Sequence, residues 1–309
     1  MKGFFTNTSA SHQLGLLICL FLVGFLLFTA VFMLHSSPIY GPDGSSSYHL
    51  IGSDFYSIQA TQFLSAVLIL LLPAIGLAFL CSERLTKYLY LYKMTDVRVY
   101  LLTTLMLLFI SPAMDIVSHF NANMQLPDSM ALIESLMRKS EDLAREATMR
   151  LLSEEGILPL IVNIIVIAVM AGVAEEFFFR GALLPVVKRI VKNRHVAIWL
   201  VAILFSAIHF QFYGFVPRML LGALLGYLMY WSGSLWIPVF AHFLNNAIAV
   251  VGIYFMSDRE DFLKRFGSLE PEMNPEELPA MAIAAVVGLV LFAVCVKLMK
   301  RICPLRENH

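Results

Sequence analysis

The chain has 309 residues, of which 59% are hydrophobic and only 14% are charged, and its mean hydropathy is +0.77. Soluble domains carry about a quarter charged residues, so this composition excludes an ordinary water-soluble protein. Lys and Arg number 22, as do Asp and Glu, so no net field points to nucleic acid or an acidic substrate. The sequence predicts an integral membrane protein that binds no nucleic acid.

Apolar runs recur along the chain. A helix needs about 20 apolar residues to cross a hydrocarbon core of about 30 Å. We predict an all-α transmembrane helix bundle of about eight spans, at approximately residues 13–34, 63–81, 99–119, 157–187, 195–212, 216–231, 235–256 and 279–299. The single membrane domain divides into residues 1–156, 157–256 and 257–309, with an outer helix in the first part and an acidic loop in the last.

Basic residues in the loops predict the orientation, because Lys and Arg accumulate on the cytoplasmic side. If eight spans alternate, one side receives Lys2, Arg84, Lys87, Lys93, Arg98, Lys188, Arg189, Lys192, Arg194, Lys297, Lys300, Arg301 and Arg306. Both termini are therefore predicted to be cytoplasmic, with the plasma (inner) membrane as the location if the host is bacterial. The opposite side receives segment 35–62, whose Pro, Gly and Ser predict a loop, and the acidic segment 257–278.

The segment 121–155 falls on the same outer side. Its apolar residues repeat at helical spacing with charges between them, which indicates an amphipathic helix. It is either a lid or substrate guide on the outer membrane surface, or a solvated connecting helix.

The four cysteines, Cys19, Cys81, Cys295 and Cys303, lie in or beside apolar runs and show no C-x-x-C spacing. They are therefore predicted to be small apolar packing residues rather than disulfides or thiolate metal ligands.

Ionisable side chains concentrate in three of the spans. Spans one, two and eight carry no acid or His in their interiors, whereas spans four, five and seven hold two Glu, an Arg and two His. An ionisable group inside a bilayer costs a few kcal/mol and usually faces a cavity or a partner, so this concentration indicates a functional site.

Span four carries Glu175, Glu176 and Arg180. Glu176 and Arg180 are four residues apart and share a helix face, which favours an ion pair. Glu175 is rotated by about 100° and is not neutralised so directly, so it is the better candidate for a chemically active carboxylate. The alternative is that both acids serve packing and charge pairing.

Spans five and seven carry the histidines. Phe205 and His209 share a face of span five, and taken alone His209 is more typical of a satisfied core residue than of a catalyst. His242 and Asn246 are four apart on span seven and form a pair of donors suited to an anionic oxygen, whereas Asn245 points elsewhere.

The depths of these groups can be compared through the helical rise. Glu175 lies 13 residues, about 20 Å, from Lys188, and His209 lies 14 residues, about 21 Å, from His195. His242 follows the turn at 232–234 by only eight residues, about 12 Å. Its depth agrees less well, so either that turn is recessed or Pro238 and helix tilt shift the helix.

The combined residues supply the groups for hydrolysis by activated water. A buried carboxylate can act as general base, a neutral His can share the water, and a His with an Asn can stabilise the oxyanion. The H-E-x-x-H, G-x-S-x-G and G-x-G-D patterns of other hydrolases are absent.

Three motifs in residues 157–256 resemble the CPBP or Abi family of type II CAAX prenyl endopeptidases and bacteriocin-processing proteases. They are E-E-x-x-x-R at Glu175, Glu176 and Arg180, F-x-x-x-H at Phe205 and His209, and H-x-x-x-N at His242 and Asn246. The resemblance implies an eight-helix intramembrane endopeptidase whose cavity opens toward the cytoplasm. It also implies that Glu175 and His209 activate water, that His242 and Asn246 bind the oxyanion, and that Glu176 and Arg180 support the geometry.

The expected partners are membrane lipids and a peptide or lipidated-protein substrate. We favour no cofactor, because His242 with Asn246 suits an oxyanion better than a metal shell. The alternative is zinc held by Glu175, His209 and His242. The other function classes are a proton- or ion-coupled transporter, and a non-enzymatic scaffold or immunity protein with the family fold.

Two further features have simple predicted roles. Gly222 and Gly226 form a G-x-x-x-G pattern that indicates a close helix contact within the bundle, with a dimer interface as the alternative. A monomer is favoured. Arg218 is a candidate for binding a substrate carboxylate, but we favour snorkelling to the outer headgroups.

Overall fold

The computed structural model describes residues 2–34, 36–40, 46–50, 55–93, 96–152, 154–255, 276 and 278–303. The α-helices are α1 (Ala10–Leu34), α2 (Phe55–Ser65), α3 (Leu72–Cys81), α4 (Leu85–Tyr88), α5 (Val97–Ala122), α6 (Ala131–Leu152), α7 (Ile157–Asn163), α8 (Ala171–Glu176), α9 (Leu184–Val191), α10 (Arg194–Ala207), α11 (Phe215–Ser232), α12 (Trp236–Phe255) and α14 (Leu278–Ile302). The π-helical segments are η1 (Ala66–Leu71), η3 (Ile164–Met170) and η4 (Phe177–Leu183), and the 3₁₀ turns are η2 (Asp128–Met130) and η5 (Phe212–Gly214).

Seven helices of the described chain are long and apolar enough to cross a membrane. They are Ala10–Leu34, Phe55–Cys81, Val97–Ala122, Ile157–Val191, Phe212–Ser232, Trp236–Phe255 and Leu278–Ile302. The predicted all-α transmembrane bundle is confirmed, and the chain is an integral membrane protein. The predicted span 195–212 is the shorter helix α10, which has 14 residues and ends at Ala207.

The loop predicted for residues 35–62 is wrong over much of its length. Strands β1 (Ser36–Tyr40) and β2 (Ser46–Leu50) pair antiparallel with Ser36 opposite Leu50, and α2 begins at Phe55. The Gly and Pro residues that indicated a loop fall largely between the two short strands in the sequence. The predicted acidic segment lies outside the described residues except at 276 and 278, as does Arg306.

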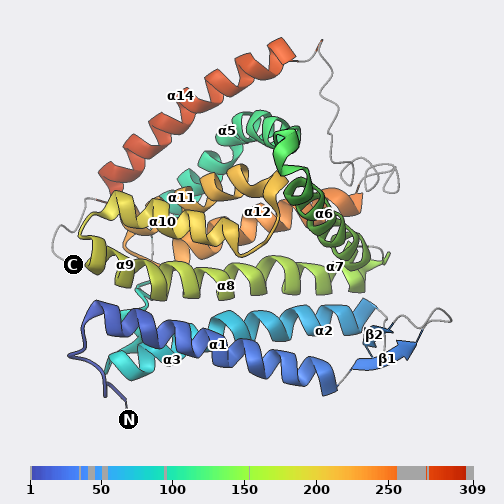
Figure 1. The fold of residues 1–309 in the computed structure, drawn as a ribbon. Helices are drawn as coiled ribbons and strands as arrows, with labels where there is room; N and C mark the ends of the chain where they lie inside the picture. The colour runs from blue at the N-terminus through green and yellow to red at the C-terminus, as the bar shows by residue number, and fades with distance from the viewer. Residues whose placement is uncertain are drawn as a thin grey trace.

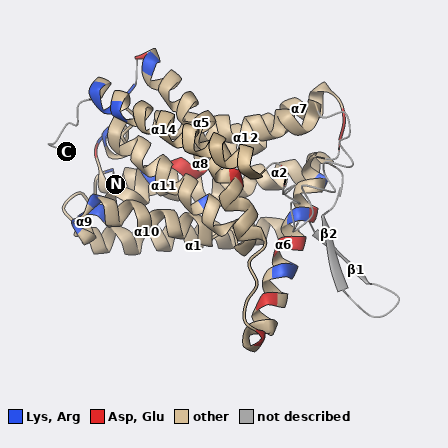
Figure 2. Ribbon diagram, turned by 90° about the horizontal axis from the view of Figure 1, so that it is seen from above, with Lys and Arg blue, Asp and Glu red and all other residues tan. Residues whose placement is uncertain are grey.

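The helices stack in layers around the continuous helix α7–α9 (Figure 1). α1 with α2 and α3 covers one side of it, and α10, α11 and α12 cover the other, with α5 and α14 beyond them. The central helix is therefore enclosed from both sides, which places the acidic residues of α8 inside the bundle rather than on its surface (Figure 2).

The two ends of the bundle differ in charge. Both chain ends lie at the same end, where Lys and Arg gather near α9 and the end of α14 (Figures 1 and 2). At the other end α6, the predicted amphipathic helix, runs across the bundle rather than along it. Leu132, Leu136 and Leu143 of α6 are exposed.

Glycines allow the closest backbone approaches between helices. A Cβ at Gly24 of α1 would lie 2.1 Å from the carbonyl oxygen of Leu68, and a Cβ at Gly288 of α14 would lie 2.1 Å from that of Phe109 in α5. The predicted G-x-x-x-G contact is confirmed within the bundle, because a Cβ at Gly226 of α11 would lie 2.9 Å from Ile198 of α10.

Gly24→Ala is expected to destabilise the protein by about 1–3 kcal/mol, because the new methyl group forces α1 away from η1. Gly15→Ala is the matched control in the same helix, since no atom lies within 4 Å of the place its methyl group would take. Thermal unfolding in detergent measures both. Equal melting temperatures for the two variants would show that α1 and η1 do not pack this closely.

Candidate active site

The buried ion pair Glu176–Arg180 forms the centre of the polar site. Glu176 ends α8 and Arg180 lies in the π-helical segment η4 that follows. Arg180 Nη1 donates to Glu176 Oε1 at 2.7 Å, and both side chains have 0% exposure. The ion pair predicted from the spacing is confirmed. Each charge is neutralised by the other where water does not reach.

Arg180 also joins the central helix to the two helices that cover it. Its Nη2 donates to the carbonyl of Gly222 in α11 at 2.8 Å, and its guanidinium lies 4.6 Å from the ring centroid of Phe205 in α10. Gly222 allows this approach, since a Cβ there would lie 3.1 Å from the Phe205 ring.

His242 completes the buried cluster from α12. Its Nδ1 lies 2.8 Å from Glu176 Oε1, and its Nε2 lies 3.9 Å from Glu175 Oε2. Because a carboxylate only accepts, Nδ1 of His242 carries the hydrogen. The sequence assigned Glu176 to Arg180 alone, and helical spacing gave no signal that Glu176 also holds His242.

The turn between α11 and α12, which precedes His242, is buried in the protein. Ser234 and Leu235 are buried. Ser234 Oγ donates to the carbonyl of Tyr92, and the Leu235 amide donates to the carbonyl of Tyr90 at 2.9 Å. The turn is thus covered by the segment after α4. This burial is compatible with the first of the two explanations offered for the short spacing, a recessed turn, which stays a prediction.

Glu175 differs from its neighbour in both exposure and bonding. Its side chain is 17% exposed, whereas that of Glu176 is fully buried. Its Oε2 is buried but accepts no hydrogen bond from the described residues. Glu175 is therefore the carboxylate of this pair to which Arg180 does not bond, as the 100° rotation between adjacent helical residues predicts.

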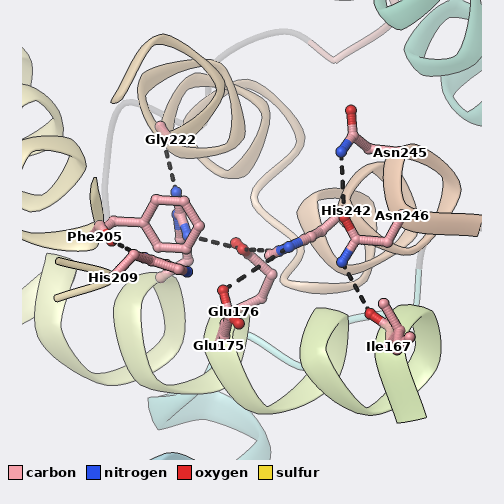
Figure 3. Close-up of polar contacts among 10 residues, drawn as sticks. Ile167, Glu175, Glu176, Phe205, His209, Gly222, His242, Asn245 and Asn246 are labelled. Atoms are coloured by element: carbon pink, nitrogen blue, oxygen red, sulfur yellow. Dashed lines mark hydrogen bonds and ion pairs between the residues drawn. The ribbon is translucent and has the colours of Figure 1, made fainter. Parts of the chain in front are cut away.

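His209 lies in a turn rather than in a helix, so the predicted helical run through residue 212 is wrong. α10 ends at Ala207, and Phe210 has a left-handed backbone with φ of 53°. His209 still packs on Phe205 as predicted, with ring centroids 5.3 Å apart. Its Nδ1 lies 2.8 Å from the Phe205 carbonyl and donates to it, which leaves Nε2 as an acceptor. The imidazole points toward Glu175 (Figure 3).

Asn246 follows His242 by one turn of α12 but faces the central helix. Its Nδ2 donates to the carbonyl of Ile167 in η3 at 3.0 Å, and its Oδ1 accepts from Asn245 at 3.2 Å (Figure 3). Asn245 is exposed. One of the two amide hydrogens of Asn246 is thus committed to the backbone.

Among the described residues, which include Glu175, His209 and His242, no group of three or more His, Cys, Asp or Glu is arranged to hold a metal ion. His242 and His209 both direct Nδ1 to protein oxygens, so only their Nε2 atoms remain as possible metal ligands.

Arg218 does not snorkel, contrary to the favoured prediction. Its Nη2 donates to Gln211 Oε1 at 2.6 Å, and its Nη1 is buried without a hydrogen-bond partner among the described residues. The carboxylate-binding role, which the sequence favoured less, is compatible with this placement.

The fold and the site define a polytopic α-helical membrane protein with an ionisable cluster inside its bundle. Residues 157–248 match the family model of type II CAAX prenyl endopeptidase Rce1-like proteins. That segment contains every predicted site residue, so the resemblance predicted from three motifs is confirmed there.

One curated relative is a Bacillus subtilis (strain 168) protein described as "Uncharacterized protein YpbD". It is 29% identical over 120 residues, which cover 38% of this chain and 59% of the relative. The chain therefore spans about three fifths of the length of the curated relative it matches. No solved structure matches the chain.

Arg180→Met is expected to destabilise the protein by about 3–5 kcal/mol, because it leaves the Glu176 carboxylate buried without its cation. Arg98→Gln is the control: Arg98 pairs with Asp96 on the surface, its side chain is 68% exposed, and little change is expected. Thermal unfolding in detergent compares them. A similar loss in both variants would contradict a special role for the buried pair.

Proposed function

We propose that the protein is an intramembrane endopeptidase that hydrolyses a peptide bond of a membrane-associated or lipidated substrate with activated water. The observation that carries this proposal is the convergence on one polar cluster of Glu175 from α8, His242 from α12 and His209 from the turn after α10. The match of this segment to an endopeptidase family supports it. That match does not favour a transporter or an inert scaffold.

Glu175 and His209 are the proposed water-activating pair. The hydrogen bond from His209 Nδ1 to the Phe205 carbonyl leaves Nε2 to accept one hydrogen of a water molecule. Glu175 takes the other proton as the water oxygen attacks the carbonyl carbon of the substrate. When the tetrahedral intermediate breaks its carbon–nitrogen bond, Glu175 returns that proton to the leaving amine. The hydroxyl group of the water thereby ends in the new carboxyl group, and its proton ends on the amine.

His242 and Asn246 are the proposed oxyanion donors. His242 already donates Nδ1–H to Glu176, so it needs a protonated Nε2 to donate a second hydrogen bond. The carboxylates of Glu175 and Glu176 flank the ring and stabilise that imidazolium form. Asn246 would contribute the amide hydrogen that Ile167 does not use. Glu176 and Arg180 act as positioning residues that hold His242 in place.

For orientation, we propose that the basic end of the bundle is cytoplasmic, which puts both termini on that side. In a bacterium the membrane would be the plasma (inner) membrane. We propose that the protein acts as a monomer among membrane lipids, because the site residues all come from one chain.

Glu175→Gln is expected to lower the cleavage rate by about 10²–10⁴-fold, the usual contribution of a general base, without unfolding the protein. His209→Ala should cause a loss of similar size. Glu83→Gln is the control, since Glu83 is an exposed acid outside the spans. Purified protein in liposomes would be incubated with farnesylated and unmodified membrane peptides, and products identified by mass spectrometry. Undiminished cleavage by Glu175→Gln would refute the assignment.

Chelation distinguishes the two hydrolytic mechanisms. We favour the glutamate mechanism, so cleavage should survive EDTA and phenanthroline with an unchanged rate. The same reaction progress curves, recorded before and after dialysis against chelator, measure this. If chelation abolishes cleavage and added zinc restores it, the glutamate mechanism is wrong and a metal-dependent mechanism replaces it.

A further inference from the structure

Arg218 carries an unused hydrogen-bonding group next to the site. It lies in the first turn of α11, four residues before Gly222, which accepts from Arg180. Four residues make about one helical turn. The backbone of Arg218 therefore lies about 6 Å along the axis of α11 from Gly222, the residue that Arg180 contacts. Arg218 Nη2 is held by Gln211, but Nη1 is buried and donates to no described residue. A buried donor without an acceptor is unfavourable unless a ligand supplies one.

Two carboxylates interact electrostatically with the Arg218 guanidinium, although neither accepts a hydrogen bond from Nη1. The negative charges that affect Arg218 are Glu141 of α6 and Glu175 of the site, and Arg218 in turn acts on His209. The Oε2 atoms of Glu141 and Glu175 are buried and accept no hydrogen bond from described residues. The positive charge of Arg218 therefore lies between the proposed catalytic pair and α6.

α6 is docked on the turn that carries His209. Ser140 Oγ donates to the Phe210 carbonyl at 2.8 Å, and the Arg138 guanidinium lies 4.9 Å from the Tyr213 ring centroid. Burial raises the pKa of the Glu141 carboxyl, so the ionised form that would pair with a cation is disfavoured. α6 thus holds near Arg218 an acid whose Oε2 accepts no hydrogen bond from the described residues.

We propose that Arg218 is an anion subsite of the active site that binds a carboxylate of the peptide substrate, and that Glu141 of α6 occupies its vicinity until substrate arrives. The proposal rests on the proposed function and narrows its substrate class to peptides with a carboxylate near the scissile bond. Arginine suits this role because its planar fork matches a carboxylate. Such a contact would fix the peptide relative to Glu175 and His209.

The test compares peptides that differ only in charge. The probes are an S-farnesyl peptide with a free C-terminal carboxylate, its C-terminal amide, and an amide with Glu as the last residue, which separates a terminal from a side-chain carboxylate. Wild type should show a KM about tenfold lower for a carboxylate peptide than for the plain amide, the effect of one charge-assisted hydrogen bond. Arg218→Gln should abolish that preference while kcat stays similar, and Arg218→Lys should retain part of it.

A merely structural role for Arg218 would affect all three peptides equally, and an unchanged preference in Arg218→Gln would overturn the subsite. Arg98→Gln, which removes an exposed arginine that pairs with Asp96, should behave as wild type. Equilibrium binding of the same peptides by fluorescence anisotropy separates the two proposals. If no peptide is cleaved but the Arg218-dependent preference persists in binding, the protease assignment fails and the subsite stands. If the peptides are cleaved without that preference, the protease assignment stands and the subsite fails.

Glu141→Gln tests the part played by α6. Removing the competing acid should lower the KM of the carboxylate peptide about threefold, the size of a weak charge interaction, and leave the KM of the amide unchanged. Glu146→Gln is the matched control on the same helix, because Glu146 is 59% exposed and pairs with Arg150. A KM that is unchanged or raised in Glu141→Gln would refute the occupancy of the subsite by α6.

Discussion

The Glu176–Arg180 ion pair has no water to solvate it, and the rest of the site depends on this constraint. A charge left alone inside a bundle surrounded by hydrocarbon is strongly unfavourable, so each partner must find its acceptors or donors within the protein. Arg180 reaches α10 and α11 through Phe205 and Gly222. Glu176 reaches α12 through His242. One pair on the central helix thereby fixes the distance of three other helices from it.

The same constraint gives two adjacent acids different properties. Glu176 accepts from both Arg180 and His242, so its charge is compensated and it is held still. Glu175 accepts nothing from Arg180, and its side chain is partly exposed. A general base needs to be ionised, near water and unattached to a strong donor, and only the second environment allows this. Glu176, which positions His242, and Glu175, the proposed general base, are therefore neighbours in sequence that need opposite environments: one bonded and buried, the other unbonded and near water.

Local spacing explains what the sequence could predict. The Glu176–Arg180 pair and the Phe205–His209 contact both follow from residues four apart, and long apolar runs predict most of the spans. The Glu176–His242 bond was not predicted because it joins α8 to α12, two helices far apart in the sequence, and local spacing does not show how such helices are placed side by side. The end of α10 was missed because apolar residues continue past Ala207 to Phe212 with no Pro or Gly to mark a stop.

The early end of α10 has a consequence for the lipid around it. Its 14 residues measure about 21 Å, whereas a hydrocarbon core is about 30 Å thick. Val196, Leu200 and Ile203 are exposed along it, so the helix faces lipid. Lipids adapt to such hydrophobic mismatch by thinning, at a cost of fractions of a kcal/mol per Å. The membrane beside the His209 turn is then expected to be locally thin, so that any helix lying next to this turn would lose part of its hydrocarbon cover.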